Sequence, residues 1–202
     1  MIDDVKFGPK NIGMDSLKID MNSFQALKQV GIGEDLLDVS PLELSGGQKR
    51  RVAIAGVLAM EPEVLILDEP TAGLDVEARN EILDLLREYI AQDEKRTILI
   101  TSHISTDLES LCDDIYLIHD GKIILHEDTD VILEQYGILK VNEEQYRTLD
   151  KTAVIKVQKE TYGYACFTND RRFYQENYPQ IAVEQGGIDE LILMTVSYTH
   201  LT

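Results

Sequence analysis

Two short, almost continuously apolar runs constrain the fold of this chain more than any other feature of its sequence. They are Val64–Asp68 (VLILD) and Thr97–Thr101 (TILIT). Such runs are typical of strands buried on both faces of a parallel sheet. The segment between them predicts an amphipathic helix that Asp75 is placed to cap, because its apolar residues recur three and four positions apart. Strand, helix and strand in this order predict a βαβ unit, and therefore an α/β fold.

A serine followed by two glycines precedes another segment that the sequence predicts to be helical. Ser45 is a favourable N-cap residue, and a helix is expected over about Gly46–Met60. Gly46 and Gly47 let the backbone approach an anion closely. The helix N-terminus then offers unpaired N–H groups and the positive end of a dipole to a phosphate.

Acidic residues and a histidine follow the two apolar runs. The first run ends in Asp68, which Glu69 follows, and His103 lies just beyond the second run. Open α/β sheets bind their ligands at the carboxyl ends of the strands. There Asp68 could hold Mg²⁺ through its waters. Glu69 could accept a proton from a water that attacks a γ-phosphate, and His103 could donate to the same phosphate group.

Together these features resemble the ATP-binding subunit of an ABC transporter. The stretches that carry the resemblance are, in chain order, Leu44-Ser45-Gly46-Gly47-Gln48, Leu65-Ile66-Leu67-Asp68-Glu69-Pro70, Gly73-Leu74-Asp75 and Ser102-His103. In that family they are the signature, Walker B, D-loop and switch-histidine motifs. The resemblance implies a P-loop NTPase-like ABC ATPase core that hydrolyses ATP and powers membrane transport.

The resemblance also implies how these residues are used. Two subunits sandwich ATP head to tail, so the signature residues of one subunit bind the γ-phosphate held by the other; they are Ser45, Gly46, Gly47 and Gln48. Glu69 is then the catalytic base and His103 the sensor of the γ-phosphate. Asp68 is the Mg²⁺ ligand, and Asp75 couples the two sites across the interface.

ATP and Mg²⁺ are therefore the expected cofactors. The expected partners are a second ABC ATPase subunit, identical or different, and membrane permease subunits. The net charge of −18 argues against nucleic acid as a partner, because phosphate backbones bind basic faces. Two cysteines cannot form a disulfide framework, and the sequence has no apolar run of the ~20 residues that a membrane-spanning helix needs. The expected location is the cytoplasm, at the inner face of the membrane through the permease.

The family's phosphate loop, G-x-x-x-x-G-K-[ST], is not found upstream of the signature. Gly8–Gly13 has the glycine spacing, but Met14 and Asp15 replace the lysine and the hydroxyl residue, and Pro9 removes an N–H. The segment Asp4–Gly13 instead resembles the start of the family's helical subdomain. The ATPase core is therefore expected to be incomplete, without its phosphate-loop half, and the chain alone is expected neither to bind nor to hydrolyse ATP.

Two subfamily resemblances point in different directions. Phe7–Asn11 and Ser40–Glu61 resemble the ATPase of energy-coupling factor importers. From about Ile82 onward the chain resembles an exporter-type ABC ATPase of Gram-positive bacteria. The hypothesis is a chimera joined within Asp68–Asp75, where the two families are nearly identical. The alternative is a single gene of an intermediate lineage.

The expected domain organisation has three parts. Residues 1–140 form the partial ATPase domain, with the helical and signature subdomain over about 1–62 and the Walker B to switch-histidine core over about 63–140. Its opening, before the signature, is expected to be loop-rich with one helix. Residues 141–195 form a small α+β appendage. Residues 196–202 are interpreted as derived from a sequencing adapter, because they back-translate into a transposon-end sequence used in tagmentation libraries.

Three smaller features are interpreted as structural. Lys49-Arg50-Arg51 is taken as the solvated side of the signature helix, and Asp120-Gly121 predicts a hairpin between two strand-like runs. Strand propensity and packing account for the tyrosines near the C-terminus, which are Tyr162, Tyr164, Tyr174 and Tyr178.

Two alternatives to the transport ATPase stay open. One is a non-catalytic fragment that binds no nucleotide alone. The other is a soluble ABC ATPase that works on chromosomes or ribosomes. Chromosome-type members place long heptad coils before the signature, and this sequence has none. Ribosome-type members carry two cassettes, whereas one signature is found here.

Overall fold

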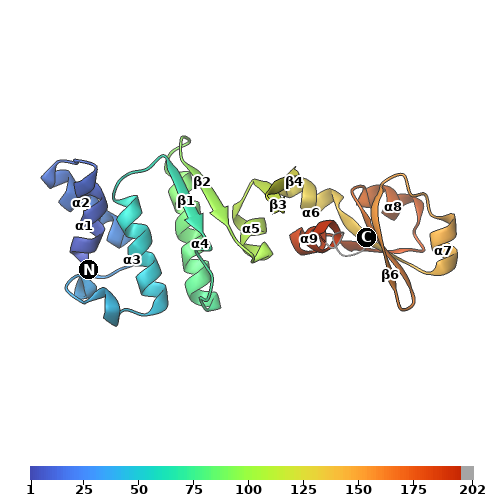
Figure 1. Cartoon of the computed structure of the whole chain (residues 1–202), viewed down its shortest axis with the longest axis horizontal. Helices are drawn as coiled ribbons and strands as arrows, with labels where there is room; N and C mark the ends of the chain where they lie inside the picture. The colour runs from blue at the N-terminus through green and yellow to red at the C-terminus, as the bar shows by residue number, and fades with distance from the viewer. Residues whose placement is uncertain (197–202) are drawn as a thin grey trace. The chain divides into compact units, whose positions relative to one another are not determined.

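The computed structural model describes residues 1–196 of the chain (Figure 1). The described part forms two compact units, one spanning Met1–His103 and the other beginning at Ile104. The division predicted at residue 140 and the adapter origin of residues 196–202 stay predictions. All but the first residue of that tail lie outside the described part.

Three packed helices open the first unit. They are α1 (Ile2–Asn11), α2 (Ser16–Gln29) and α3 (Gly46–Leu58), which pack pairwise against one another. Short 3-10 turns, η1 (Glu34–Leu36) and η2 (Pro41–Glu43), join α2 to α3. The bounds of α3 agree with the helix predicted after Ser45.

The prediction of a loop-rich opening with one helix was wrong, because α1 is a helix in spite of Gly8 and Pro9. A Cβ atom at Gly8 would lie 3.2 Å from the carbonyl oxygen of Gly56 in α3, so the glycine allows the two helices to approach closely. Val5 and Pro9 are buried in the same packing. Tertiary packing therefore outweighs the low helix propensity of this segment.

The predicted βαβ unit is present in the second half of this unit. It consists of β1 (Val64–Asp68), α4 (Val76–Ala91) and β2 (Thr97–Thr101), and the two strands pair in parallel. Val64 lies opposite Thr97, and Asp68 lies opposite Thr101. The carboxyl ends of the two strands are thus level.

The prediction that these strands are buried on both faces was wrong. Leu65 is 1% exposed, whereas Ile66 and Leu99 are 70% and 56% exposed. Helix α4 runs beside the strand pair (Figure 1). Among the described residues the sheet holds β1 and β2 alone, and one of its faces carries exposed apolar side chains.

The second unit begins with α5 (Ser105–Leu111) and a hairpin of β3 (Asp114–His119) and β4 (Lys122–Asp128). The hairpin confirms the prediction from Asp120-Gly121. Asp120 and Gly121 have φ angles of +48° and +72°. Two consecutive positive φ values are typical of the type I′ turn that matches the twist of the flanking strands. Helix α6 (Thr129–Gln135) follows.

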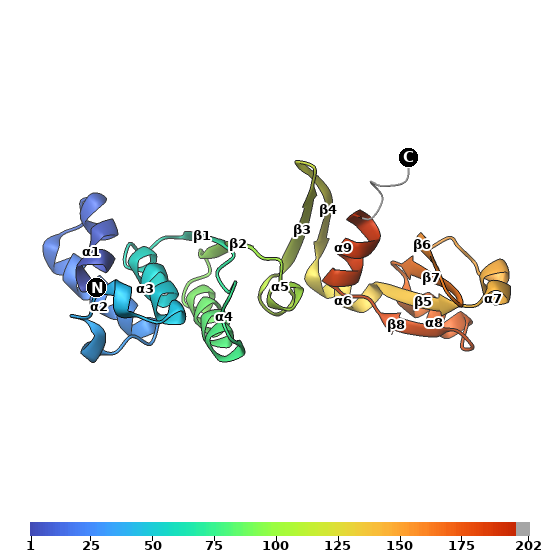
Figure 2. The ribbon, with the colours of Figure 1, turned by 60° about the horizontal axis from the view of Figure 1, so that its bottom comes forward.

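A four-stranded antiparallel sheet forms the rest of the second unit, which confirms the predicted α+β character. In chain order its elements are β5 (Gly137–Val141), α7 (Glu143–Thr148), β6 (Val154–Glu160), β7 (Gly163–Thr168), α8 (Arg171–Asn177) and β8 (Ala182–Gln185). The strand order is β6-β7-β5-β8, which with the β-α-β-β-α-β succession is the split βαβ arrangement. Helix α9 (Ile188–Val196) lies beside the β3–β4 hairpin (Figure 2).

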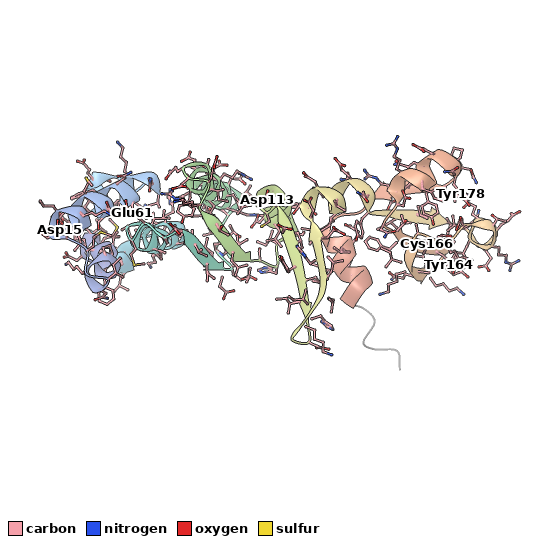
Figure 3. The ribbon with its side chains drawn as sticks, turned by 90° about the horizontal axis from the view of Figure 1, so that it is seen from above. Asp15, Glu61, Asp113, Tyr164, Cys166 and Tyr178 are labelled. Atoms are coloured by element: carbon pink, nitrogen blue, oxygen red, sulfur yellow. The ribbon has the colours of Figure 1, made fainter. Side chains whose placement is uncertain are left out.

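Each face of this sheet has its own apolar core. Ile138 and Phe167 pack with Ile188 of α9 on one face. Leu139 and Cys166 pack with Tyr174 of α8 on the other. Tyr174 is fully buried, and the labelled Tyr164, Cys166 and Tyr178 lie in this part of the structure (Figure 3).

The packing role predicted for the tyrosines is confirmed for three of them, which belong to or pack against the second core: Tyr164, Tyr174 and Tyr178. Tyr162 is the exception, because its side chain is 93% exposed.

No described helix combines the length and the apolar character that crossing a membrane requires.

Burial raises the pKa of both thiols. Burial, and secondarily the Asp113 carboxylate, raises the pKa of Cys112 to about 11. Burial raises the pKa of Cys166 to about 11 as well. Because the thiolate is the reactive form, we expect the folded chain to react slowly with Ellman's reagent near neutral pH. The reaction should accelerate as the pH approaches these values, and it should be fast in guanidinium.

Cys112→Ser and Cys166→Ser variants assign the measured rates to the individual thiols. Fast labelling of the folded chain at neutral pH would contradict the burial of the labelled cysteine.

Candidate active site

The N-terminus of α3 is a capped helix start. Ser45 accepts a hydrogen bond from the backbone N–H of Gln48 at 3.2 Å, and the Gln48 side chain accepts one from the N–H of Ser45 at 2.9 Å. This reciprocal pair is a capping box. A Cβ atom at Gly46 would meet no atom within 4 Å, so the backbone there is open to an approaching group. Gly47 faces Ala78 of α4.

Asp68 is the last residue of β1, and its carboxylate is exposed. The hydroxyl of Thr101, directly opposite on β2, donates a hydrogen bond to Asp68 Oδ1. The last residues of the two strands are therefore joined through their side chains as well as through the sheet.

Glu69 lies immediately after β1 and has a φ angle of +48°. Its backbone N–H donates to the carbonyl oxygen of Thr101 at 3.0 Å. Its carboxylate oxygen Oε2 lies 2.6 Å from Nδ1 of His103. The His103 side chain is 70% exposed and that of Glu69 is 36% exposed. An acid and a histidine in direct contact, both reachable from solvent, can exchange a proton with a bound water.

The loop after Glu69 leads into α4. Gly73 has a φ angle of +72°, which a side chain would strain. Asp75 caps α4 by accepting a hydrogen bond from the N–H of Ala78 at 2.9 Å, as its sequence position predicts. In this chain the Asp75 carboxylate therefore orders its own helix.

The interpretation of Lys49-Arg50-Arg51 as a solvated face was wrong for its two arginines. Arg50 donates a hydrogen bond to the backbone carbonyl of Glu69. Arg51 forms an ion pair with Glu81 of α4 at 3.0 Å and is 21% exposed. Arg50 thus connects the signature helix to the residue that follows β1, and Arg51 connects it to α4.

The structure thus brings Asp68, Glu69 and His103 together at the ends of β1 and β2. The signature residues lie at the start of α3, which Arg50 joins to Glu69. Sequence reasoning missed Thr101 and Arg50. A hydroxyl at the last position of an apolar strand was a usable signal for Thr101, whereas the partner of Arg50 depends on tertiary packing.

Asp68 fits a magnesium ligand by its chemistry. Mg²⁺ prefers oxygen ligands and is commonly held by one or two carboxylates together with waters and substrate phosphates, rather than by a protein cage. An exposed carboxylate at a strand end meets that requirement. Within residues 1–196 no cluster of three or more metal-binding side chains is present.

Comparisons with known proteins agree with the motifs. Residues 9–72 match the family model described as "ABC transporter". The energy-coupling factor transporter ATP-binding protein EcfA2 of Streptococcus agalactiae is 42% identical over 140 residues, 69% of this chain and 49% of that protein. EcfA2 of Bacillus subtilis is 49% identical over 123 residues, 61% of this chain and 44% of that protein. The matched part of this chain is similar to the ABC transporter family.

Solved ABC ATPases share the fold. One of them is cbiO1 from Clostridium perfringens, described as part of the ABC transporter complex cbiONQ. It matches with a TM-score of 0.56 at 44% identity, and the match covers 64% of this chain and 51% of the cbiO1 chain. Another is the ATP-binding cassette MJ0796, a dimer bound to ADP and Pi. It matches with a TM-score of 0.51 at 27% identity, and the match covers 58% of this chain and 50% of the MJ0796 chain. The P-loop NTPase-like fold predicted from the motifs is therefore confirmed.

The chain spans about half the length of the curated ABC relatives it matches. A 140-residue match in a chain of 202 residues starts at residue 63 at the latest and ends at residue 140 at the earliest. The likeness to EcfA2 therefore extends on both sides of Asp68–Asp75. The chimera hypothesis stays a prediction, which one unbroken sequencing read across this region of the gene would test.

Removing the Arg50 guanidinium should lower the stability of the first unit. We expect Arg50→Met to lower the free energy of unfolding by about 1.5–3 kcal/mol, because the Glu69 carbonyl loses a charged donor. Urea unfolding followed by circular dichroism measures this loss. Lys49→Met is the matched control, since Lys49 is exposed and donates to the Leu42 carbonyl at the surface. Equal losses in the two variants would contradict a particular role for Arg50.

Proposed function

We propose that this chain is part of the ATP-hydrolysing subunit of an ABC transporter, which powers transport through a separate permease. The observation that carries the proposal is the 2.6 Å contact between Glu69 and His103 beside the Asp68 carboxylate. A group that accepts a proton from water, a donor to the phosphate oxygens and a carboxylate that holds Mg²⁺ are groups that promote ATP hydrolysis at a γ-phosphate.

The proposed roles follow from where each group lies. Glu69 accepts a proton from the attacking water, and its contact with His103 orients its carboxylate. His103 donates to the γ-phosphate from the end of β2. Asp68 holds Mg²⁺, which when bound neutralises part of the phosphate charge. Most of the rate enhancement then comes from position and electrostatics rather than from covalent chemistry.

The signature residues act on the nucleotide of a second ABC ATPase subunit. Ser45, Gly46, Gly47 and Gln48 form a capped helix start whose backbone is open at Gly46, which suits a terminal phosphate. Asp75 couples the two sites across the interface. The dimeric cassette MJ0796 with ADP and Pi and the cbiO1 subunit of a larger transporter complex support this arrangement. The subunit would then lie in the cytoplasm, against the permease at the membrane.

Glu69→Gln tests the base. In an ATPase subunit that carries this chain together with a phosphate loop, we expect the variant to lower the turnover of ATP by about 10²–10⁴-fold, because the amide cannot accept the proton. ATP binding and dimer formation should persist, since the backbone contacts of Glu69 are unchanged. Phosphate release measures turnover, and gel filtration with ATP measures dimer formation.

Glu88→Gln is the matched control, because Glu88 is an exposed acid on α4 next to Tyr89, which contacts the segment before β1 rather than the carboxyl ends of the strands. Full hydrolysis by Glu69→Gln would exclude Glu69 as the base. Equal losses in both variants would point to an effect of charge alone.

A non-catalytic chain is the second candidate. It is favoured by the segment Gly8–Gly13, because Met14 and Asp15 follow it in place of the lysine and the hydroxyl residue of a phosphate loop. The first four residues of this segment also lie within helix α1. We therefore expect the 202-residue chain by itself to leave the fluorescence of trinitrophenyl-ATP unchanged in the presence of Mg²⁺. Tight, Mg²⁺-dependent binding would contradict this expectation and exclude the non-catalytic reading.

A further inference from the structure

Thr101 occupies a special position relative to the two acidic residues. It is the last residue of β2 and lies directly opposite Asp68. Its hydroxyl donates to Asp68 Oδ1 and accepts a hydrogen bond from the N–H of Glu69 at 3.2 Å. Its backbone carbonyl accepts from the same N–H at 3.0 Å. One residue of β2 thus contacts both consecutive acids of the neighbouring strand end.

The chemistry of a hydroxyl suits this bridge. A threonine hydroxyl has one proton to donate and lone pairs with which to accept. Here the hydroxyl donates its hydrogen bond to the Asp68 carboxylate and accepts one from the backbone N–H of Glu69. Donation to a charged acceptor is among the stronger hydrogen bonds in proteins.

We propose that Thr101 is a positioning residue that fixes the orientation of the Asp68 carboxylate for Mg²⁺ and holds Glu69 beside it. The proposal rests on the function proposed above, because it assigns a role within the same site. A carboxylate that holds a metal binds it more tightly when a hydrogen bond orients it, and loss of such a partner lowers affinity or activity. The β-branched Thr101 has few rotamers, so its hydroxyl is itself held in place.

A purely structural role for the hydroxyl makes different predictions. Thr101 is exposed, so its replacement by valine opens no cavity in a core. Valine has the same shape and a similar strand propensity. If the hydroxyl served stability alone, Thr101→Val would shift the unfolding midpoint and leave the Asp68 side chain ordered.

The first experiment uses the 202-residue chain without nucleotide or metal. NMR coupling constants of the Asp68 β-protons report whether its side chain holds one χ1 rotamer. We expect one rotamer in the wild-type chain and in Thr101→Ser, which keeps the hydroxyl, and rotamer averaging in Thr101→Val. Thr97→Val is the matched control at the other end of the strand, opposite Val64. The Thr97→Val variant should leave Asp68 in one rotamer. Rotamer averaging of Asp68 in the wild-type chain overturns the proposal. A single Asp68 rotamer in Thr101→Val overturns it as well.

The second experiment measures ATP hydrolysis against Mg²⁺ concentration in an ATPase subunit that carries this chain and a phosphate loop. Thr101→Val should raise the Mg²⁺ concentration for half-maximal rate by about tenfold, while Thr101→Ser and Thr97→Val stay close to wild type. Unchanged Mg²⁺ dependence in Thr101→Val, with Glu69→Gln inactive, overturns the role of Thr101 and leaves the proposed function intact. Hydrolysis that survives Glu69→Gln overturns the proposed function instead, whatever the NMR experiment gives.

Discussion

The parallel pairing of β1 with β2 is the interaction on which the candidate site depends. Because Asp68 lies opposite Thr101, the strands end level, and the residues that follow them leave the sheet at the same edge. Glu69 and His103 then meet, although 33 residues separate them in the sequence. A shift of this register by one residue would turn the side chains of one strand to the opposite face.

Electrostatics explains why so many hydrogen bonds gather at this edge. Asp68 and Glu69 are adjacent acids in a chain of net charge −18, and a nucleotide would bring further negative charge. The described donors offset this charge from several directions: the Thr101 hydroxyl, the His103 ring and the Arg50 guanidinium. A divalent cation and the N-terminus of a helix from a second subunit would add the positive potential that a triphosphate needs.

The parts of the structure that the sequence predicted are those with local causes. The caps formed by Ser45 and Asp75, the βαβ succession and the turn at Asp120-Gly121 follow from short patterns and agree with the structure. Helix α1 and the contacts of Arg50 could not be read this way, because packing between distant segments decides them. The exposed face of β1 and β2 was missed for a related reason. An apolar run indicates a strand, but not how many neighbours cover it.

The strand pair is held at both of its ends, which explains how a two-stranded sheet can position a site. At the amino ends, the Tyr89 hydroxyl of α4 donates to the Pro62 carbonyl before β1, and Arg96 before β2 donates to the Tyr89 carbonyl at 3.1 Å. At the carboxyl ends, Thr101 joins Asp68 and Glu69. Isolated pairs of strands are marginally stable in water and need packing against a helix. Helix α4 therefore holds the segments that enter the two strands, while Thr101 orients the acidic residues at their carboxyl ends.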